Sequence, residues 1–378
     1  PPRSKILCMG ENTKECEGSI SHEVYYRIFR IMERNVSMKI AVDAMGGDYA
    51  PEEIVLGAIE AIKAYSFDVV LVGDREKIEE VLARYGEKES ERLSIVHASQ
   101  VIDMGEHPAQ AFRKKKDASI VVATRLVKEG TCDAVVAAGS TGAAVTAALL
   151  GLGRIKGIER PCIATPIPSK KGITVLLDSG ANSNSKPKHL VEGAIMGYHY
   201  AKAILGIAKP TVGLLNIGEE ASKGNELSQA TYPMLEKLKT ISFYGNVEGR
   251  DIPKGTVDVV VCDGFVGNVI LKFGEGMAMF IIRLVRETIK HSGFIAKLGA
   301  LAVYPALKSL KKRLDFTEYG GAPLLGVNGS FIICHGSSKA KAIKNAIRVA
   351  GELVQQDVVG HIRKSIEEEE VEQYGNEG

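Results

Sequence analysis

From Met38 onward, short runs of β-branched and aliphatic residues alternate with longer stretches whose apolar positions recur at helical spacing. This alternation is typical of βαβ units, in which helices cover both faces of a mostly parallel sheet. The pattern predicts strands at residues 39–43, 69–72, 94–96, 134–137, 174–177, 211–215, 257–261 and 331–334. It predicts helices between most of these strands, among them 51–65, 75–85, 118–129, 188–205 and 338–357. We therefore expect a three-layer α/β/α fold.

The two ends of the chain depart from this pattern. Residues 1–37 mix charges of both signs and lack the apolar region of a signal peptide, whereas Met38 reads like a natural start that runs into a strand. We expect 1–37 to be a weakly ordered N-terminal extension and 38–364 to be the folded domain. Glutamates crowd residues 365–378, which we expect to be a solvated acidic tail.

Composition narrows the class of protein. The 378 residues are 45% hydrophobic and 25% charged, with 40 glycines and a net charge of +2. A large aliphatic core is therefore possible, and the near-neutral balance argues against general nucleic-acid binding. The six cysteines show no CxxC pair and no zinc spacing, so we expect reduced thiols in a cytosolic protein. The longest apolar run, 298–306, is too short to cross a bilayer, and we expect no transmembrane helix.

Five predicted strands end in turns that are rich in glycine and polar residues. In an open α/β sheet, ligands bind outside the carboxyl ends of the strands, so we expect these turns to line one site. Their candidate binding residues are Asp43, Gly46, Gly47, Gly139, Ser140, Thr141, Gly142, Asp178, Asn182, Asn216, Gly218, Glu219, Asp263, Gly264 and Gly267.

The turn at 139–142 is the candidate phosphate cradle. It lies between a strand and a helix of small residues at 143–150, and the free N–H groups at a helix N-terminus attract anions. The same residues could instead form only a close-packed turn. The chain contains no Gly-Lys-[Ser/Thr] loop, no dinucleotide-binding glycine spacing and no Gly-x-Ser-x-Gly nucleophile motif. Cys262 ends a buried strand, where a small hydrophobic role is expected rather than catalysis.

Three further side chains could act in this site. Lys223 precedes Gly224 and Asn225 in a strand-end turn, where its ammonium could neutralise phosphate or polarise a carbonyl, although surface lysines are usually only solvated. Asn268 offers an amide, but asparagine also occurs in turns for its backbone tolerance. His335 could line the site or simply be a satisfied turn histidine.

Two basic segments remain outside these turns, and each could be only a solvated face. The first consists of Arg113, Lys114, Lys115 and Lys116. The second, at 308–313, accompanies apolar residues that include Leu298 and Leu301, so residues 294–314 resemble an element that lies in a membrane interface. The alternative for this second segment is a core helix or a dimer-contact helix with a basic outer face.

Taken together, the strand-end turns resemble one family, the bacterial phosphate acyltransferases that supply acyl phosphate to the membrane-bound glycerol-3-phosphate acyltransferase. The matching segments are AVDAMGGD at 41–48, AGSTGA at 138–143, LDSGAN at 177–182, LLNIGEE at 214–220 with KGN at 223–225, GNVEGRD at 245–251, DGFVGN at 263–268, YGGAPLLG at 319–326 and HGSS at 335–338. The match runs from Met38 to about Gly351. Ser140 and Ser179 depart from the expected Asn and Val.

The resemblance implies a fold like that of the isocitrate and isopropylmalate dehydrogenases and phosphotransacetylase, with two α/β lobes around a cleft, an interfacial helical segment at about 277–314, and a homodimer. It implies transfer of a fatty acyl group from acyl carrier protein to inorganic phosphate, with neither a metal nor an organic cofactor. Lys223 corresponds to the family's catalytic lysine and Asn268 to its catalytic asparagine. Because acyl carrier protein is acidic, residues 113–116 become its expected docking surface.

The resemblance also implies a cytoplasmic enzyme that associates peripherally with the inner face of the cell membrane through Leu298 and Leu301. Two alternatives stay open. A decarboxylating dehydrogenase of the same fold would need a metal-binding carboxylate cluster, for which Asp258 and Asp263 are too few. A non-catalytic scaffold for carrier protein would leave the polar strand-end turns unexplained.

Overall fold

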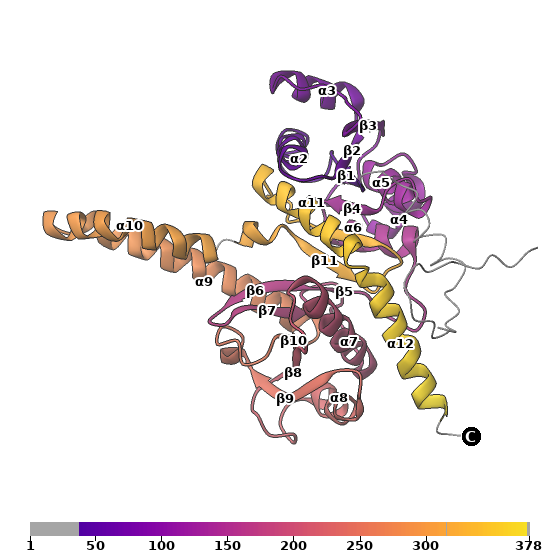
Figure 1. Cartoon of the computed structure of the whole chain (residues 1–378), viewed down its shortest axis with the longest axis vertical. Helices are drawn as coiled ribbons and strands as arrows, with labels where there is room; N and C mark the ends of the chain where they lie inside the picture. The colour runs from indigo at the N-terminus through magenta and orange to yellow at the C-terminus, as the bar shows by residue number, and fades with distance from the viewer. Residues whose placement is uncertain (1–37, 315, 376–378) are drawn as a thin grey trace, which may run out of the picture. The chain divides into compact units, whose positions relative to one another are not determined.

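The computed structural model describes residues 38–314 and 316–375, with side chains for 38–309 and 318–369. The expected extension at 1–37 lies outside the described residues. Two sheets form the described fold (Figure 1). The first has seven strands in the order β3-β2-β1-β4-β12-β11-β5. Their bounds are β1 Lys39–Asp43, β2 Asp68–Gly73, β3 Leu93–His97, β4 Ala134–Ala137, β5 Cys162–Ile163, β11 Ala322–Leu325 and β12 Ser330–Ile333.

The second sheet has five strands in the order β6-β7-β10-β8-β9. Their bounds are β6 Thr165–Ser169, β7 Gly172–Leu177, β8 Thr211–Asn216, β9 Ser242–Glu248 and β10 Val259–Val261. All neighbouring pairs are parallel except those that involve β5, β6 or β11. The expectation of a mostly parallel α/β fold is therefore confirmed, and the parallel strands are divided between two sheets.

Helices cover the sheets because their apolar faces pack against the apolar side chains of the strands. One apolar cluster runs through both sheets, and its side chains come from strands and from helices α2, α7, α11 and α12. A second cluster joins the other face of the first sheet to α5 and α6. The bounds are α2 Glu52–Ala64, α3 Arg75–Arg84, α4 Pro108–Lys114, α5 Ser119–Lys128, α6 Thr141–Ala147, η1 Ala148–Leu152, α7 Pro187–Ile204, α8 Glu226–Lys237, η2 Gly249–Asp251, η3 Phe316–Tyr319, α11 Ala340–Gln355 and α12 Val358–Gly375.

Two long helices, α9 (Gly264–His291) and α10 (Phe294–Leu314), pack against each other as a hairpin (Figure 1). Apolar side chains along both helices face solvent, including Phe273, Phe280 and Leu301. By length and composition alone, α9 could cross a membrane. The expectation that the chain has no transmembrane helix rests on the longest uninterrupted apolar run, 298–306, which does not include α9. The side chains of the basic segment from Leu310 onward lie outside those described.

The C-terminal region differs from the expected solvated tail. Helix α12 runs to Gly375, so the boundary placed at 364/365 falls inside a helix. Ile366 and Glu369 are buried, and the Glu369 carboxylate accepts a hydrogen bond of 2.5 Å from the Thr240 hydroxyl. The charge of the glutamate run predicts a solvated tail, but helical spacing turns Glu369 toward the protein.

Candidate functional site

The turns after β1, β4 and β12 pack together at the carboxyl edge of the first sheet. Gly47 has a φ of +100°, and a Cβ there would lie 2.3 Å from the Ala138 carbonyl oxygen and 3.0 Å from that of Gly336. Asp48 N–H also donates to the Gly336 carbonyl at 2.8 Å. Only glycine permits so close an approach of three backbones. A Cβ on Gly139 would lie 3.7 Å from Gly46 Cα, so Gly46, Gly47, Gly139 and the 335–338 turn lie together at this edge.

Asp43 ends β1 with its carboxylate turned inward. Its side chain is 3% exposed, and Oδ1 accepts a hydrogen bond of 3.2 Å from Met45 N–H. Burial raises the pKa of this carboxyl above its ordinary value, while bonds from Ser119 and the Met45 and Gly46 backbone act in the opposite direction. The Asp43 carboxylate thus organises the turn that carries Gly46 and Gly47.

The 139–142 turn opens a helix, as expected. Ser140 is the N-cap of α6, and its hydroxyl accepts a hydrogen bond from Ala143 N–H at 3.4 Å. Thr141 and Gly142 are exposed at this N-terminus. With η1, the helix continues from Thr141 to Leu152, so the first-turn N–H groups stand at the positive end of an unbroken run. The alanines of α6 are buried in the core of the first sheet.

On the second sheet, Asp178 organises the turn after β7. Its carboxylate accepts five hydrogen bonds of 2.8–3.1 Å, from the backbone N–H groups of four residues and from the Asn182 amide. Burial raises the pKa of Asp178 above its ordinary value despite these donors. One donor is Ile163 N–H in β5, which belongs to the first sheet. Asp178 therefore also ties the second sheet to the first, a role that its position in the sequence did not reveal.

The first turn of α9 packs directly on the Asp178 turn. A Cβ on Gly267 would lie 1.9 Å from the Asp178 carbonyl oxygen, and one on Gly264 would lie 2.4 Å from the Asn182 carbonyl oxygen. Asp263 caps the helix by accepting bonds of 3.0 Å from Phe265 and Val266 N–H. At both glycines the helix backbone contacts the backbone of the turn. Because residues three apart lie on the same face of a helix, both glycines face the turn.

Asn268 follows these glycines and is exposed beside Gly180, whose added Cβ would lie 3.5 Å from the Asn268 amide oxygen. The side chain of Asn268 forms no hydrogen bond within the described part of the chain. Its amide is therefore presented at the strand-end edge with its donors and acceptor available to a ligand.

The 216–225 turn is rigid although it is exposed. Asn216 bonds the Lys223 carbonyl oxygen at 3.0 Å, and Gly224, with a φ of +101°, leaves no room for a side chain against Asn216. Asn225 caps α8 by accepting a bond from Ser228 N–H at 3.0 Å. Asn216, Gly224 and Asn225 are thus scaffold residues that hold Lys223 in place.

The Lys223 ammonium is solvent-exposed, and across the described residues it has no ion-pair partner. Its Cγ would lie 3.2 Å from a Cβ added to Gly218, so glycine at 218 gives the lysine stem its space. Strands β8 and β10 are neighbours in the sheet, and the turns that carry Lys223 and Asn268 follow their carboxyl ends. The structure therefore puts both side chains on one edge, while no contact between them is formed in the described residues.

The two edges are connected through β5 and the Asp178 turn. Ser179 N–H and its hydroxyl both bond the Ile163 carbonyl oxygen, at 3.0 Å and 3.1 Å. Ala181 packs against the apolar cluster of the first sheet. The candidate residues therefore form two groups, one on each sheet, and the Asp178 turn contacts both sheets.

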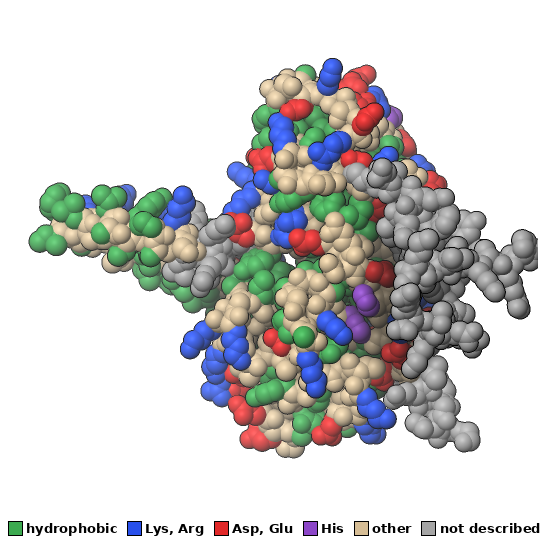
Figure 2. All heavy atoms as spheres, in the orientation of Figure 1, with side chains coloured by type: hydrophobic (Ala, Val, Ile, Leu, Met, Phe, Trp, Pro, Cys, Tyr) green, Lys and Arg blue, Asp and Glu red, His purple; other side chains and the backbone are tan. Residues whose placement is uncertain are grey.

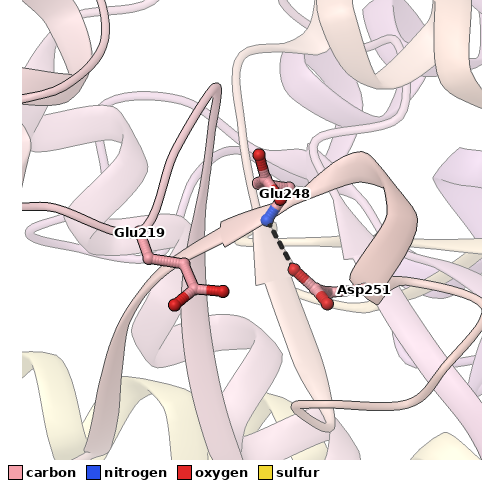
Figure 3. A group of neighbouring side chains, drawn as sticks. All are labelled: Glu219, Glu248 and Asp251. Carbon is pink, nitrogen blue, oxygen red and sulfur yellow. Dashed lines mark hydrogen bonds between the residues drawn. The ribbon is translucent and has the colours of Figure 1, made fainter.

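One group of carboxylates could hold a cation. Glu219, Glu248 and Asp251 offer oxygen atoms within 4.8 Å of one another (Figure 3). Asp251 accepts a bond of 2.9 Å from Glu248 N–H and pairs with Lys254 at 3.0 Å, while Glu248 pairs with Arg250. Two cations thus already offset two of the three carboxylates, and Glu248 and Asp251 have the geometry of a capped turn. The sequence reading placed Glu219 among the site residues but did not anticipate this cluster.

Of the remaining candidates, His335 lies in the turn after β12 at the first-sheet edge, whereas the basic segment 113–116 lies outside the strand-end turns. His335 is exposed after β12, and its Nδ1 accepts from Ser337 N–H at 3.2 Å and lies 2.7 Å from the Ser337 hydroxyl. In the basic segment, Lys115 bonds the Val101 carbonyl oxygen and pairs with Glu106, and Lys116 lies 5.4 Å from the Phe112 ring centroid. Arg113 and Lys114 are exposed.

Asn246 is a residue that the sequence reading left out of the site. It is 3% exposed on β9, and its amide donates a bond of 2.8 Å to the Glu220 carbonyl oxygen in the Lys223 turn. It lies in the GNVEGRD segment at 245–251, which contributed to the resemblance without being assigned a role. Its place in that matching segment was the signal available from the sequence.

Comparisons with known proteins show to which family the chain belongs. A family described as "Fatty acid synthesis protein" matches residues 38–361. A relative named "Phosphate acyltransferase" from Pelotomaculum thermopropionicum is 57% identical over 338 residues, which cover 89% of this chain and 98% of the relative. Another with that name, from Heliobacterium modesticaldum, is 59% identical over 329 residues, which cover 87% of this chain and 98% of the relative.

Among solved structures, a phosphotransacetylase from Streptococcus pyogenes has a TM-score of 0.58 at 16% identity, covering 89% of this chain and 100% of that chain. The EutD phosphotransacetylase from Staphylococcus aureus has a TM-score of 0.57 at 14% identity, covering 87% and 97%. These two likenesses concern the fold, which agrees with the expected relation to phosphotransacetylase. From its family match and its relatives, the chain belongs to the phosphate acyltransferase family and is an acyltransferase.

Proposed function

We propose that the protein transfers a long-chain fatty acyl group from the thioester of acyl carrier protein to inorganic phosphate, giving acyl phosphate for glycerol-3-phosphate acylation in bacterial phospholipid synthesis. The observation that carries this proposal is that Asn268 and Lys223, which has no ion-pair partner among the described residues, are both exposed on one strand-end edge. The glycine turns behind them are fixed by backbone contacts, which suits a site that must position a small anion.

Each part of the reaction has a candidate group. Phosphate is held by the N–H groups at the 139–142 turn, and the Lys223 ammonium offsets its charge and aims it at the thioester carbonyl. As the nucleophile adds, negative charge develops on the carbonyl oxygen, and the Asn268 amide donates a hydrogen bond to it. The tetrahedral intermediate then collapses to acyl phosphate, and the carrier thiolate leaves.

The cysteines that the structure describes favour direct transfer over a covalent acyl-enzyme. Cys132, Cys162, Cys262 and Cys334 are all buried. Burial, helped by Asp263 and Asp178, raises the pKa of the Cys262 thiol well above its ordinary value, so this thiol stays protonated and unreactive at neutral pH. Phosphate is already ionised at that pH, so the reaction does not require a protein nucleophile.

The test is phosphate-dependent consumption of long-chain acyl carrier protein by the purified protein. Activity should require phosphate, persist in excess chelator without added nicotinamide, and run backward from acyl phosphate. Lys223→Ala and Asn268→Ala should each lower kcat by about 10²-fold or more, because each removes charge stabilisation from the transition state. Lys209→Ala, at the other end of β8, is the matched control and should retain activity. If both site variants kept more than about half of the parental kcat, the assigned roles would be wrong.

For the partners, we propose that acidic acyl carrier protein docks on the basic segment 113–116, with Arg113 and Lys114 as the contacts. Lys115 is already paired with Glu106, so it adds little to that surface. Charge complementarity of this kind raises the encounter rate more than the affinity. Reversing Arg113 and Lys114 to Glu should therefore raise KM for acyl carrier protein while kcat stays near the parental value.

We propose that the α9–α10 hairpin is used in a homodimer and at the inner surface of the cell membrane, which would place this cytoplasmic enzyme near the membrane-bound glycerol-3-phosphate acyltransferase. Leu298 and Leu301 are 51% and 71% exposed, which supports an apolar partner for α10.

Vesicle sedimentation tests the membrane role. Binding should rise with anionic lipid and fall in the Leu298→Glu/Leu301→Glu variant, whereas Met234→Glu on α8 adds an exposed carboxylate as a control. Sedimentation velocity of the same variants reports the oligomeric state. If the double variant bound vesicles like the parent but lost the dimer, α10 would be the dimer contact instead.

A further inference from the structure

A surface hollow of about 640 Å³ lies beside the β6–β7 turn, away from Lys223 and Asn268, and we call it the lysine hollow. It is lined by Lys170, Lys171, Tyr244, Lys254 and Thr256. The β6–β7 turn stands at the amino end of β7, whereas the Asp178 turn follows the carboxyl end of that strand. Figure 2 shows Lys and Arg side chains gathered where β6 and β7 lie in Figure 1.

The backbone under the hollow is fixed by the packing of two turns. Lys170 N–H donates to the Pro253 carbonyl oxygen at 2.9 Å. Gly255 has a φ of +69°, and a Cβ there would lie 2.8 Å from the Ser169 hydroxyl and 3.2 Å from the Lys171 Cβ. The loop that leads to β10 therefore presses against the β6–β7 turn and holds the stems of the lysines on one side of the hollow.

The positive charge of the hollow is only partly balanced by nearby carboxylates, because Asp251 pairs with Lys254 and leaves the charges of Lys170 and Lys171. Asp251 is 7% exposed, and its oxygens already accept from a backbone N–H, a hydroxyl and the Lys254 ammonium. Asp258 accepts from the N–H and hydroxyl of Thr211, both at 2.8 Å. Lys170 and Lys171 are exposed and form no ion pair within the described residues. Ammonium groups gathered in this way repel one another unless an anion joins them.

The shape of the hollow indicates what kind of anion it suits. Lysine binds phosphate as a point charge, and the hollow offers such charges on one side. Tyr244 is 58% exposed and presents an apolar ring with a hydroxyl. The volume falls in the range of pockets for organic ligands, roughly 300–1,000 Å³, which is more space than inorganic phosphate alone requires.

We propose that the lysine hollow binds an organic phosphate monoester, whose phosphate lies among Lys170, Lys171 and Lys254 and whose body contacts Tyr244. The phosphate monoester could belong to a soluble small molecule or to a phospholipid headgroup, since both present the same dianion. The site is separate from the transfer reaction, and its existence does not depend on the function proposed above.

Calorimetric titration of the full chain with phenyl phosphate tests the soluble source, and flotation with vesicles containing phosphatidate tests the lipid source. Phenyl phosphate supplies a phosphate monoester with a ring that can stack on Tyr244. The Lys170→Gln/Lys171→Gln variant should weaken the affected binding by about tenfold or more, equivalent to about 1.4 kcal/mol. Lys209→Gln/Lys237→Gln removes two exposed charges elsewhere on the same half and should bind like the parent.

Two readouts distinguish this site from the catalytic edge. Phosphate-dependent acyl transfer by Lys170→Gln/Lys171→Gln should match that of the parent, because neither lysine lies at the catalytic edge. The titration measures binding and not transfer, so its outcome does not depend on the transfer proposal. Tyr244→Ala should weaken phenyl phosphate while leaving vesicle binding through the headgroup alone unchanged. Dependence of phenyl phosphate binding on the two lysines supports the soluble source, and dependence of vesicle binding supports the lipid source. If neither probe distinguished Lys170→Gln/Lys171→Gln from the parent, the proposal would be overturned.

Discussion

Replacing Gly267 by Ala would disturb the contact between α9 and the Asp178 turn. The new Cβ would lie 1.9 Å from the Asp178 carbonyl oxygen and 3.0 Å from Cys262 Sγ, whereas ordinary van der Waals contact begins at 3.4 Å. Relief of the clash requires a displacement of about 1.5 Å, which is 3.4 minus 1.9. The opposing atom belongs to a backbone held by the Asp178 carboxylate, so the helix rather than the turn has to move.

The displacement should reduce both stability and activity. Overpacking a filled contact typically costs about 1–3 kcal/mol, and each kcal/mol lowers Tm by about 2–4 °C in large domains. We therefore expect Tm to fall by about 5 °C in calorimetry, from those two magnitudes combined. Asn268 is the next residue along α9, and a shift of about 1 Å in a catalytic group can cost 10²-fold in rate.

A second glycine of α9 provides the control. An added Cβ on Gly276 meets nothing within 4 Å, so Gly276→Ala should be neutral or stabilising by up to about 1 kcal/mol through helix propensity. The reasoning would be refuted if Gly267→Ala kept a Tm within about 1 °C of the parent and a kcat within about twofold of it. The turn would then yield to the added methyl group.

Two further substitutions test buried polar groups. Asp178→Asn should lower stability by about 1–3 kcal/mol in chemical unfolding, because an amide N–H₂ would face backbone N–H donors that the carboxylate now accepts; an unchanged or higher stability would contradict this. Burial lowers the pKa of His199 from 6.5 to about 4, with His361 and Lys202 adding to the effect. Since the unfolded chain takes up this proton first, stability should fall by up to about 3 kcal/mol as pH drops from 6.5 to 4. His199→Phe should lack that part of the acid dependence, and an identical pH profile in both proteins would exclude His199 as its source.

Much of the fold could be predicted because the buried strands carry local signals. The strand at 134–137 was placed with its observed bounds, and the strand at 211–215 ends one residue short of β8. Both are aliphatic runs followed by a polar or glycine turn, a pattern that depends on neighbouring residues alone. For the same reason the sequence indicated that Lys223 and Asn268 stand at strand ends.

Three of the four missed strands share a different property, and the fourth is β9 at the edge of the second sheet. Strand β6 contains Pro166 and Pro168, which cannot donate to a ladder, so it occurs only at the edge of the second sheet. Strand β5 has two residues, and β11 contains Pro323. These strands exist because a neighbouring strand is available to pair with them, and no local pattern carries that information.

The links between distant segments could not be predicted either. The bond from Ile163 N–H to Asp178 joins the two sheets, and the contact of Gly267 with the Asp178 carbonyl seats α9. In sequence, Asp178 reads as one more polar residue of a turn, and Gly267 as one more flexible position. Only the fold shows that both residues hold backbone in place, so the sequence assigned them to binding when their observed contacts are structural.

This distinction bears on how an acyltransferase of this kind accommodates an anion. A carboxylate that faced the site would repel phosphate, yet three of the strand-end turns carry an aspartate, and the aspartates of two of them, Asp43 and Asp178, are buried. Asp43 and Asp178 are each about 3% exposed, and both accept hydrogen bonds from the turn that follows them. Burial raises the pKa of both carboxyls above their ordinary value, because the charged carboxylate loses contact with water. The hydrogen bonds from local N–H groups offset part of this cost.

Because Asp43 and Asp178 point inward, their charges do not face the site, and the second-sheet edge near α9 and α8 exposes the Asn268 amide and the Lys223 ammonium together with the carboxylates of Glu219 and Glu220. The same inward bonds fix the turns, so the exposed groups are held by backbone that is already satisfied. Substituting either aspartate should therefore disturb the site indirectly, through stability and geometry, whereas substituting Lys223 or Asn268 should reduce kcat in a protein of parental stability. That contrast separates scaffold from chemistry by two independent measurements on the same purified variants.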